Sequence, residues 1–161
     1  MRQPIAHRGT SGFTLVELLI VIVILAILAA VVIPVASNVS DQAAQAAFIT
    51  DLSVFATAYE LFNQKTGDFP EDSSSGSIPS GFDQYIRPSD WTKGTPLGGV
   101  WDSEKDSFGI KSAVGVHFMG VTPKPTAFMQ ELDATLDDGN LSTGAFQQIA
   151  NDRFYYIVRV N

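Results

Sequence analysis

Cysteine is absent from this sequence, and histidine occurs only twice among its 161 residues. Without cysteine the chain can form no disulfide bond and offers no thiol for catalysis or metal binding. Two histidines without cysteine also argue against a transition-metal site, because those ions prefer imidazole and thiolate ligands. The lack of cysteine suits an oxidising or a reducing compartment equally, so it does not locate the protein.

Positive charge is also scarce, since ten lysine and arginine residues stand against seventeen acidic ones and the net charge is −7. A nucleic-acid-binding surface needs clustered positive charge, so we expect no nucleic-acid partner.

Catalytic motifs are missing too. The serines at 73–75 and 77 lack the glycines of a nucleophile elbow, no phosphate-binding glycine loop occurs, and His117 falls in an expected strand with a structural role. We therefore expect a protein that is not an enzyme.

A long apolar run lies near the N-terminus. Residues 18–33 contain no polar side chain. The run belongs to a segment, 13–36, that is long enough for a helix to cross a bilayer. Arg2 and Arg8 precede it with no acidic residue, and positive charge marks the cytoplasmic flank of a membrane helix. Segment 13–36 is therefore predicted to span the membrane with its N-terminal end in the cytoplasm.

Two ordinary interpretations fit this run. The first is a plain single-pass anchor, in which Glu17 at the edge of the run reaches back to the membrane surface. The second is a secretory signal peptide cleaved near Ala36 or Ser37, although sixteen apolar residues slightly exceed the usual length of about 7–15. Composition alone leaves both interpretations open.

A second helical pattern follows. Residues 37–66 contain no proline and no glycine, and apolar side chains recur among them every three or four residues. Gly67 and Pro70 then end the pattern. We predict one continuous helix whose second half, 37–66, is amphipathic and must bury its apolar face. That face consists of Ala44, Phe48, Leu52, Phe55, Tyr59 and Phe62.

Residues 67–161 are predicted to form a small globular domain. The stretches GGVWD, FGIKSAVGVHFMGV and RFYYIVRV are expected strands, and residues 126–140 are expected to form a short helix that ends in a turn. Trp91, Trp101 and Phe108 are expected in the core, against the long helix. The expected fold class is α+β, with a long N-terminal helix, transmembrane in its first half, packed against a small antiparallel sheet.

The residues around the start of the apolar run resemble a known signal. A short basic leader, residues 1–12, ends in Gly12 and is followed by Phe13, by Glu17 and, within the apolar segment, by Pro34. This pattern resembles the class III signal of type IV prepilins and type II secretion pseudopilins. The resemblance implies cleavage after Gly12 by a prepilin peptidase and N-methylation of Phe13. Pro34 lacks a backbone donor and is expected to kink the helix, or, as the resemblance suggests, to mark a point of local unwinding.

The resemblance gives Glu17 a partner. Cleavage would create a positive amine on Phe13, at the membrane depth of a neighbouring subunit's Glu17. An unpaired carboxylate inside a membrane is unfavourable, and one that faces a cation is less so. We therefore expect Glu17 to guide assembly by pairing with the Phe13 amine of a subunit already in the filament.

The C-terminal domain carries a looser resemblance. Stretches such as TPLGGVWD and LDDGNLSTG look like parts of the globular domain of pseudopilin-like proteins, and major pseudopilins hold calcium in a C-terminal loop. Asp133, Asp137, Asp138 and Asn140 place several oxygen ligands near a glycine, and calcium prefers such ligands. They do not match an EF-hand loop, and acidic turns are also found simply solvated. Calcium therefore stays open, and no other cofactor is expected.

Together with the resemblance, the sequence predicts a structural filament subunit, of a type II secretion pseudopilus in preference to an adhesive pilus. The chain would enter the bacterial inner membrane as a precursor, keep its C-terminal domain periplasmic or extracellular, and polymerise with itself through its N-terminal helix. An inner-membrane platform and an assembly ATPase are partners that the resemblance implies. The alternative is a single-pass membrane-anchored binding module that does not polymerise.

Overall fold

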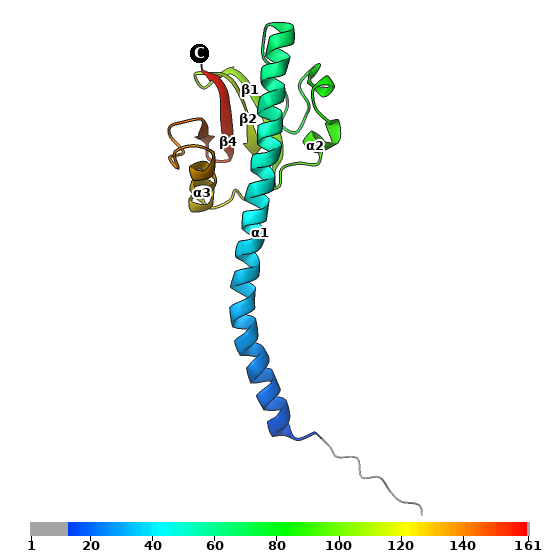
Figure 1. Cartoon of the computed structure of the whole chain (residues 1–161), viewed down its shortest axis with the longest axis vertical. Coiled ribbons are helices and arrows are strands. Elements are labelled where there is room, and N and C mark those ends of the chain that lie inside the picture. Colours follow the sequence, from blue (N-terminus) through cyan, green and yellow to red (C-terminus); the bar gives the residue numbers. More distant parts are fainter. Residues whose placement is uncertain (1–12, 161) are drawn as a thin grey trace, which may run out of the picture. The chain divides into compact units, whose positions relative to one another are not determined.

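The computed structural model describes residues 13–160, and for residues 31–38 it describes the backbone without the side chains. The leader, with Gly12, lies outside the described residues. The chain divides into two units, Met1–Asp41 and Gln42–Asn161. Its elements, seen in Figure 1, are α1 (Leu15–Thr66), the 3-10 helix η1 (Phe82–Gln84), α2 (Pro88–Thr92), β1 (Val100–Ser107), β2 (Ile110–His117), α3 (Thr126–Leu136), β3 (Phe146–Ala150) and β4 (Arg153–Val160).

Helix α1 has 52 residues and confirms the single continuous helix predicted from the sequence. Pro34 lies inside it, but its side chain is outside the described part, so the predicted kink or unwinding stays a prediction. At the other end, Gly67 adopts a φ of 82° and donates its N–H to the Asn63 carbonyl at 2.8 Å. A left-handed glycine of this kind ends many helices, as the sequence predicted.

Apart from Glu17, the described side chains at the start of α1 are apolar, and they are exposed, as Leu15 (82%) and Ile27 (62%) illustrate. No helical stretch among the described residues meets the length and apolarity that crossing a bilayer requires. The predicted membrane segment, 13–36, includes residues 31–36, whose side chains are not described. Its insertion in a membrane therefore stays a prediction.

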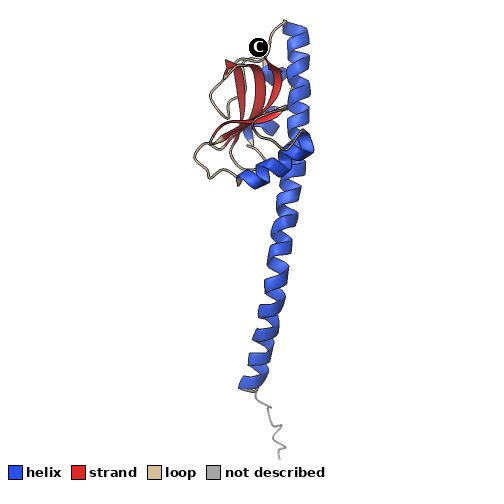
Figure 2. Ribbon diagram, turned by 90° about the vertical axis from the view of Figure 1, so that its left-hand side faces the viewer, coloured by secondary structure: helices blue, strands red, loops and turns tan. Residues whose placement is uncertain are grey.

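The four strands form one antiparallel sheet in the order β1-β2-β4-β3. Figure 2 shows this sheet beside the C-terminal part of α1. Of the two inner strands, β2 is buried over most of its length. Strand β4 alternates as predicted, with Phe154 and Tyr156 facing α1 and Tyr155 on the opposite face. The α+β class, a helix packed on a small antiparallel sheet, is thus confirmed.

Aromatic side chains join α1 to the sheet. Trp101 of β1 stacks on Phe48 with ring centroids 5.1 Å apart and meets the edge of Phe55 at 4.8 Å. Trp91 of α2 packs on Phe55 at 5.1 Å. Such pairs add to the stabilisation that burial provides. The predicted apolar face of α1 is confirmed: Phe48, Leu52, Phe55 and Tyr59 are buried, and Ala44 and Phe62 are partly buried against them.

The prediction that Phe108 lies in the core is wrong. Phe108 is 62% exposed and forms, with Gly109, the two-residue turn between β1 and β2. Both residues have positive φ, 51° and 76°. These angles belong to the type I′ turn, whose twist matches paired antiparallel strands. The backbone conformation of the turn therefore decides where the Phe108 side chain points. It points away from the core, although the side chain is apolar.

Candidate functional site

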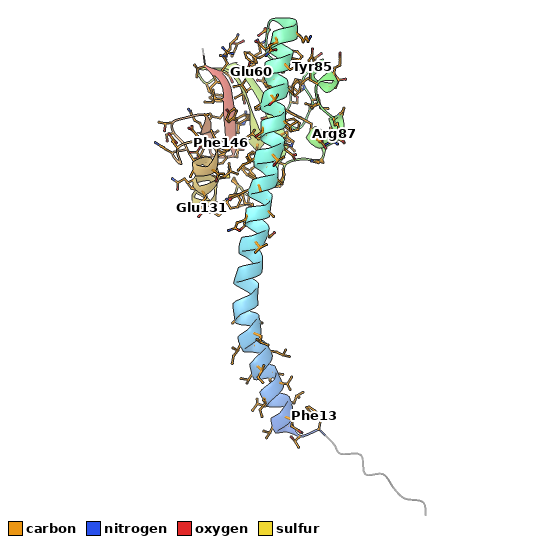
Figure 3. The ribbon with its side chains drawn as sticks, in the orientation of Figure 1. Phe13, Glu60, Tyr85, Arg87, Glu131 and Phe146 are labelled. Carbon is orange, nitrogen blue, oxygen red and sulfur yellow. The ribbon has the colours of Figure 1, made fainter. Side chains whose placement is uncertain are left out.

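The first candidate site is the start of α1. Phe13 and Thr14 precede the helix and are not helical, and the Phe13 side chain, labelled in Figure 3, is 72% exposed. The bond predicted to be cut joins Phe13 to Gly12, which lies outside the described residues. On its described side, this bond therefore lies in exposed, non-helical backbone, just ahead of the first helical residue, Leu15.

Thr14 and Glu17 form a reciprocal cap at the start of this helix. The Thr14 N–H and hydroxyl both donate to Glu17 Oε2, at 2.8 and 2.7 Å, and the Glu17 N–H lies 3.2 Å from Thr14 Oγ1. This is the capping box, in which each of the two residues accepts, on a side-chain oxygen, the backbone N–H of the other. Two N–H groups that the start of a helix would otherwise leave unpaired are thereby satisfied. Sequence reasoning missed it, although a threonine followed three residues later by a glutamate is its usual signal.

The capping box is compatible with processing. All its atoms belong to Thr14 and Glu17, so a cut before Phe13 leaves every one of its bonds in place. The box also uses only one carboxylate oxygen, Oε2, and leaves Oε1 outside it. The same glutamate can therefore begin its own helix and present an oxygen to another group.

The N-terminal segment was also compared with models of known protein families. Residues 7–33 match the family model described as the prokaryotic N-terminal methylation motif. The chain carries a type IV pilin-like prepilin signal. The match includes Gly12, Phe13 and Glu17, so the prepilin signal covers the bond predicted to be cut and the capping box, and it ends one residue before Pro34. No curated protein matches the chain.

The second candidate site is an acidic cluster at the C-terminal end of α3, the helix on which Figure 3 labels Glu131. Asp133 of α3 is fully buried, and neither of its carboxylate oxygens makes a hydrogen bond. Oxygen atoms of Asp133, Asp137 and Asp138 lie within 4.8 Å of one another. Burial raises the pKa of Asp133 above its ordinary value, and the charges of Asp138 and Asp137 raise it further.

The loop after α3 holds the other members of the cluster. Asp137 accepts the Ala145 N–H. Asp138 accepts the Asn140 N–H and the Thr143 hydroxyl, and these two bonds are both 2.8 Å long. These two bonds lower the pKa of Asp138. Asn140 itself shapes the loop, because its Oδ1 accepts the Ser142 N–H at 3.2 Å. The structure thus brings together three of the four residues predicted as ligands and engages the fourth in the turn.

These residues fit a cation with oxygen ligands. Calcium takes six to eight oxygen ligands, carboxylates among them, and the Asp133 carboxylate is buried without a partner. Gly144 closes the loop over the cluster with a φ of 77°, and a Cβ there would lie 1.8 Å from Asp137 Oδ2. A residue with a side chain would therefore displace the Asp137 carboxylate, which is why this position suits glycine.

Proposed function

We propose that this chain is a structural subunit of a type IV pilus-like filament, processed at Gly12–Phe13 and polymerised through α1. The match of residues 7–33 to the N-terminal methylation motif carries the proposal. We favour a type II secretion pseudopilus because the stretches TPLGGVWD and LDDGNLSTG look like parts of the globular domain of pseudopilin-like proteins. The subunit would sit in the bacterial inner membrane with its C-terminal domain periplasmic or extracellular. A prepilin peptidase, an inner-membrane platform and an assembly ATPase would be its partners.

The start of α1 supports a specific role for Glu17 in assembly. Removal of the leader gives Phe13 a positive amine. The capping box occupies Glu17 Oε2, so Oε1 is the oxygen that would meet the Phe13 amine of a neighbouring subunit. A pair of opposite charges in a medium of low dielectric constant attracts more strongly than the same pair in water. The attraction would set the stagger between neighbouring subunits.

The test substitutes Glu17 with alanine and with glutamine. Glu17→Gln keeps a side-chain oxygen for the capping box but removes the charge, whereas Glu17→Ala removes both. We expect both variants to be processed, as a mature mass that begins at N-methylated Phe13 would show, and to give far fewer filaments than the wild type. Glu60→Ala is the matched control, because Glu60 is a carboxylate on the same helix and pairs only at the surface with Arg159.

Two results would refute the filament proposal. A mass that begins at Met1 would indicate a plain membrane anchor, and a mass that begins near Asn38 would indicate a secretory signal peptide. Wild-type filament yield from Glu17→Gln would refute the role of the charge and leave the rest of the proposal standing. Deletion of the gene, assayed for secretion and separately for twitching, adhesion and DNA uptake, would separate the pseudopilus from the pilus.

We further propose that the acidic cluster binds calcium. The buried, unpartnered carboxylate of Asp133 supports this, since a cation would compensate the charge that burial leaves unsolvated. The expected result is a higher unfolding temperature of the chain in calcium than in EGTA, with a smaller effect of magnesium. Magnesium demands a stricter octahedral geometry and is usually held by only one or two carboxylates. An unfolding temperature that does not respond to calcium would refute the site.

A further inference from the structure

The loop between β2 and α3, residues 118–125 (yellow in Figure 1), carries two exposed apolar side chains. Met119 is 54% exposed and Val121 is 49% exposed. Phe118, the first residue of the loop, is buried in the core, and its carbonyl oxygen accepts the Val121 N–H at 3.2 Å. A closed turn that is anchored in the core thus holds both apolar side chains at the surface.

The course of the strands decides at which end of the C-terminal unit this loop lies. Strand β1 begins near Phe48 of α1, on which its Trp101 stacks. It runs toward Asp68, which follows α1 and pairs with Lys105 of β1 at 2.8 Å. Strand β2 is antiparallel to β1, so β2 ends, and the loop begins, at the level of Phe48.

The other end of the loop lies beside the same part of α1. Gln45 Nε2 donates to the carbonyl oxygen of Phe128, in the first turn of α3, at 3.3 Å. Lys124 Nζ lies 4.9 Å from the centroid of the Phe128 ring. Both ends of the loop are therefore next to residues 45–48, close to Gln42, where the C-terminal unit begins.

This end of the C-terminal unit is the one joined to the predicted membrane segment, 13–36. Residues 37–41 are the whole connection between the segment and the unit. The step from Ala36 to Gln42 covers at most about 20 Å even in a fully extended chain, which is less than the thickness of about 30 Å of the hydrocarbon core of a bilayer. Insertion of the segment therefore keeps the loop close to the lipid surface.

The loop also has the charge and the size of a lipid contact. The chain has seventeen acidic residues, yet none lies between residues 107 and 130, and Lys124 is the only charged residue of the loop. An anionic lipid surface attracts lysine, and apolar side chains are stabilised when they enter the bilayer interface. Two apolar side chains and one lysine are too few for a stable protein interface, which buries about 800 Å² on each partner.

We propose that the loop 118–125 contacts the bilayer in which the same chain is anchored, with Met119 and Val121 inserted among the lipids and Lys124 at their phosphate groups. This contact rests on the proposed function, since only a membrane-inserted subunit brings the loop to a bilayer. It restrains the C-terminal unit at the membrane surface before assembly. A subunit that leaves the membrane for a filament gives the contact up.

The test uses the absence of cysteine, which allows a single spin label at a chosen residue. The full chain with Met119→Cys is labelled and placed, one chain per disc, in nanodiscs of phosphatidylethanolamine and phosphatidylglycerol. We expect the label to collide more with oxygen, which dissolves in lipid, than with a polar nickel complex. Phe108→Cys is the matched control: Phe108 is 62% exposed in the turn at the other end of β2, and its label should prefer the nickel complex.

A label at Leu25→Cys, within the predicted membrane segment, separates two kinds of failure. If the label at residue 25 prefers oxygen while the label at residue 119 prefers nickel, the lipid contact is refuted and the proposed function stands. If the label at residue 25 also prefers nickel, membrane insertion is refuted and the lipid contact with it. A label at residue 119 that neither reagent reaches would indicate burial against protein, which also overturns the lipid contact.

A second substitution tests whether the two apolar side chains insert together. Val121→Asp, added to the chain labelled at residue 119, should reverse the preference of the label from oxygen to nickel, because a carboxylate is unfavourable among lipids. Val160→Asp is its control, since Val160 is 66% exposed and pairs with Ile110 at the other end of β2. An unchanged preference in Val121→Asp, or the same reversal in Val160→Asp, would refute the insertion of the loop.

Discussion

Replacement of Asp133 by asparagine should stabilise the calcium-free protein, although it changes a fully buried residue. In the wild type two carboxylate oxygens are buried without a hydrogen bond and next to two further carboxylates. Leaving a buried polar group unsatisfied costs about 1–3 kcal/mol, and a charged group costs more. Asparagine removes the charge and adds an NH₂ group that can donate to Asp137 or Asp138. We expect the free energy of unfolding to rise by about 1–3 kcal/mol at pH 7.

The effect should depend on pH in a defined direction. Burial raises the pKa of Asp133, so the folded chain holds this proton more strongly than the unfolded chain does. The stability that the proton provides is fully present below the unfolded pKa of about 3.9 and is lost as the pH rises through the raised folded value. The advantage of Asp133→Asn should therefore be small in acid and reach its full size near neutral pH. Asp138 has a lowered pKa, so its contribution to the stability of the fold is lost as the pH falls. This contribution is present in the wild type and in the variant alike.

Tryptophan fluorescence during urea unfolding is the natural assay, because both tryptophans, Trp91 and Trp101, are buried in the core. In EGTA the variant should be the more stable protein. In calcium at about one hundred times its dissociation constant, the wild type should gain about 2.7 kcal/mol and the variant should gain little. Asp106→Asn is the control, since Asp106 pairs with Lys111 at the surface. A variant that is less stable in EGTA, or that still responds to calcium, would refute the reasoning.

Three further substitutions test the fold. Gly115→Ala should destabilise the chain by about 3 kcal/mol or more, because a Cβ would lie 2.1 Å from the Phe154 carbonyl oxygen and force β2 from β4; a smaller loss in urea unfolding would show that the strands adjust. Trp101→Ala should cost about 3–5 kcal/mol in the same assay, since its ring packs against Phe48 and Phe55, and near-neutral behaviour would place the core elsewhere. Phe108→Asn should raise stability by about 1 kcal/mol, because asparagine tolerates the left-handed conformation better; a loss would mean that the aromatic ring stabilises the hairpin.

The parts of the fold that were predictable from the sequence depend on local periodicity. The spacing of Phe48, Leu52, Phe55 and Tyr59 at three or four residues is enough to define the buried face of α1. The same reasoning fails for Phe108, because its position in a tight turn, and not its hydrophobicity, decides how exposed its side chain is. The sequence shows an aromatic residue before a glycine but not the register of the strands on either side.

The acidic cluster was only partly predictable. One face of a helix would contain Met129, Leu132, Asp133 and Leu136, because these residues are three or four positions apart. The spacing therefore indicated that Asp133 is buried, although its charge suggested an exposed side chain. The hydrogen-bonded cluster around His117 carried no such signal, because Ser75, Asp102 and Asp152 come from distant segments. Contacts of this kind follow from how the strands pair, and strand pairing is a property of the whole chain.

Glu17 shows how the structure changes the argument about assembly. The sequence suggested a carboxylate that lacks any partner until a second subunit arrives. The capping box gives it two donors from Thr14 within its own chain, so its hydrogen bonding is partly satisfied before assembly. Neutral donors leave the negative charge in place, however, and in a membrane that charge is still unfavourable. The proposed attraction to a neighbouring amine is therefore electrostatic, and a glutamine that preserves the cap should fail in assembly almost as completely as alanine.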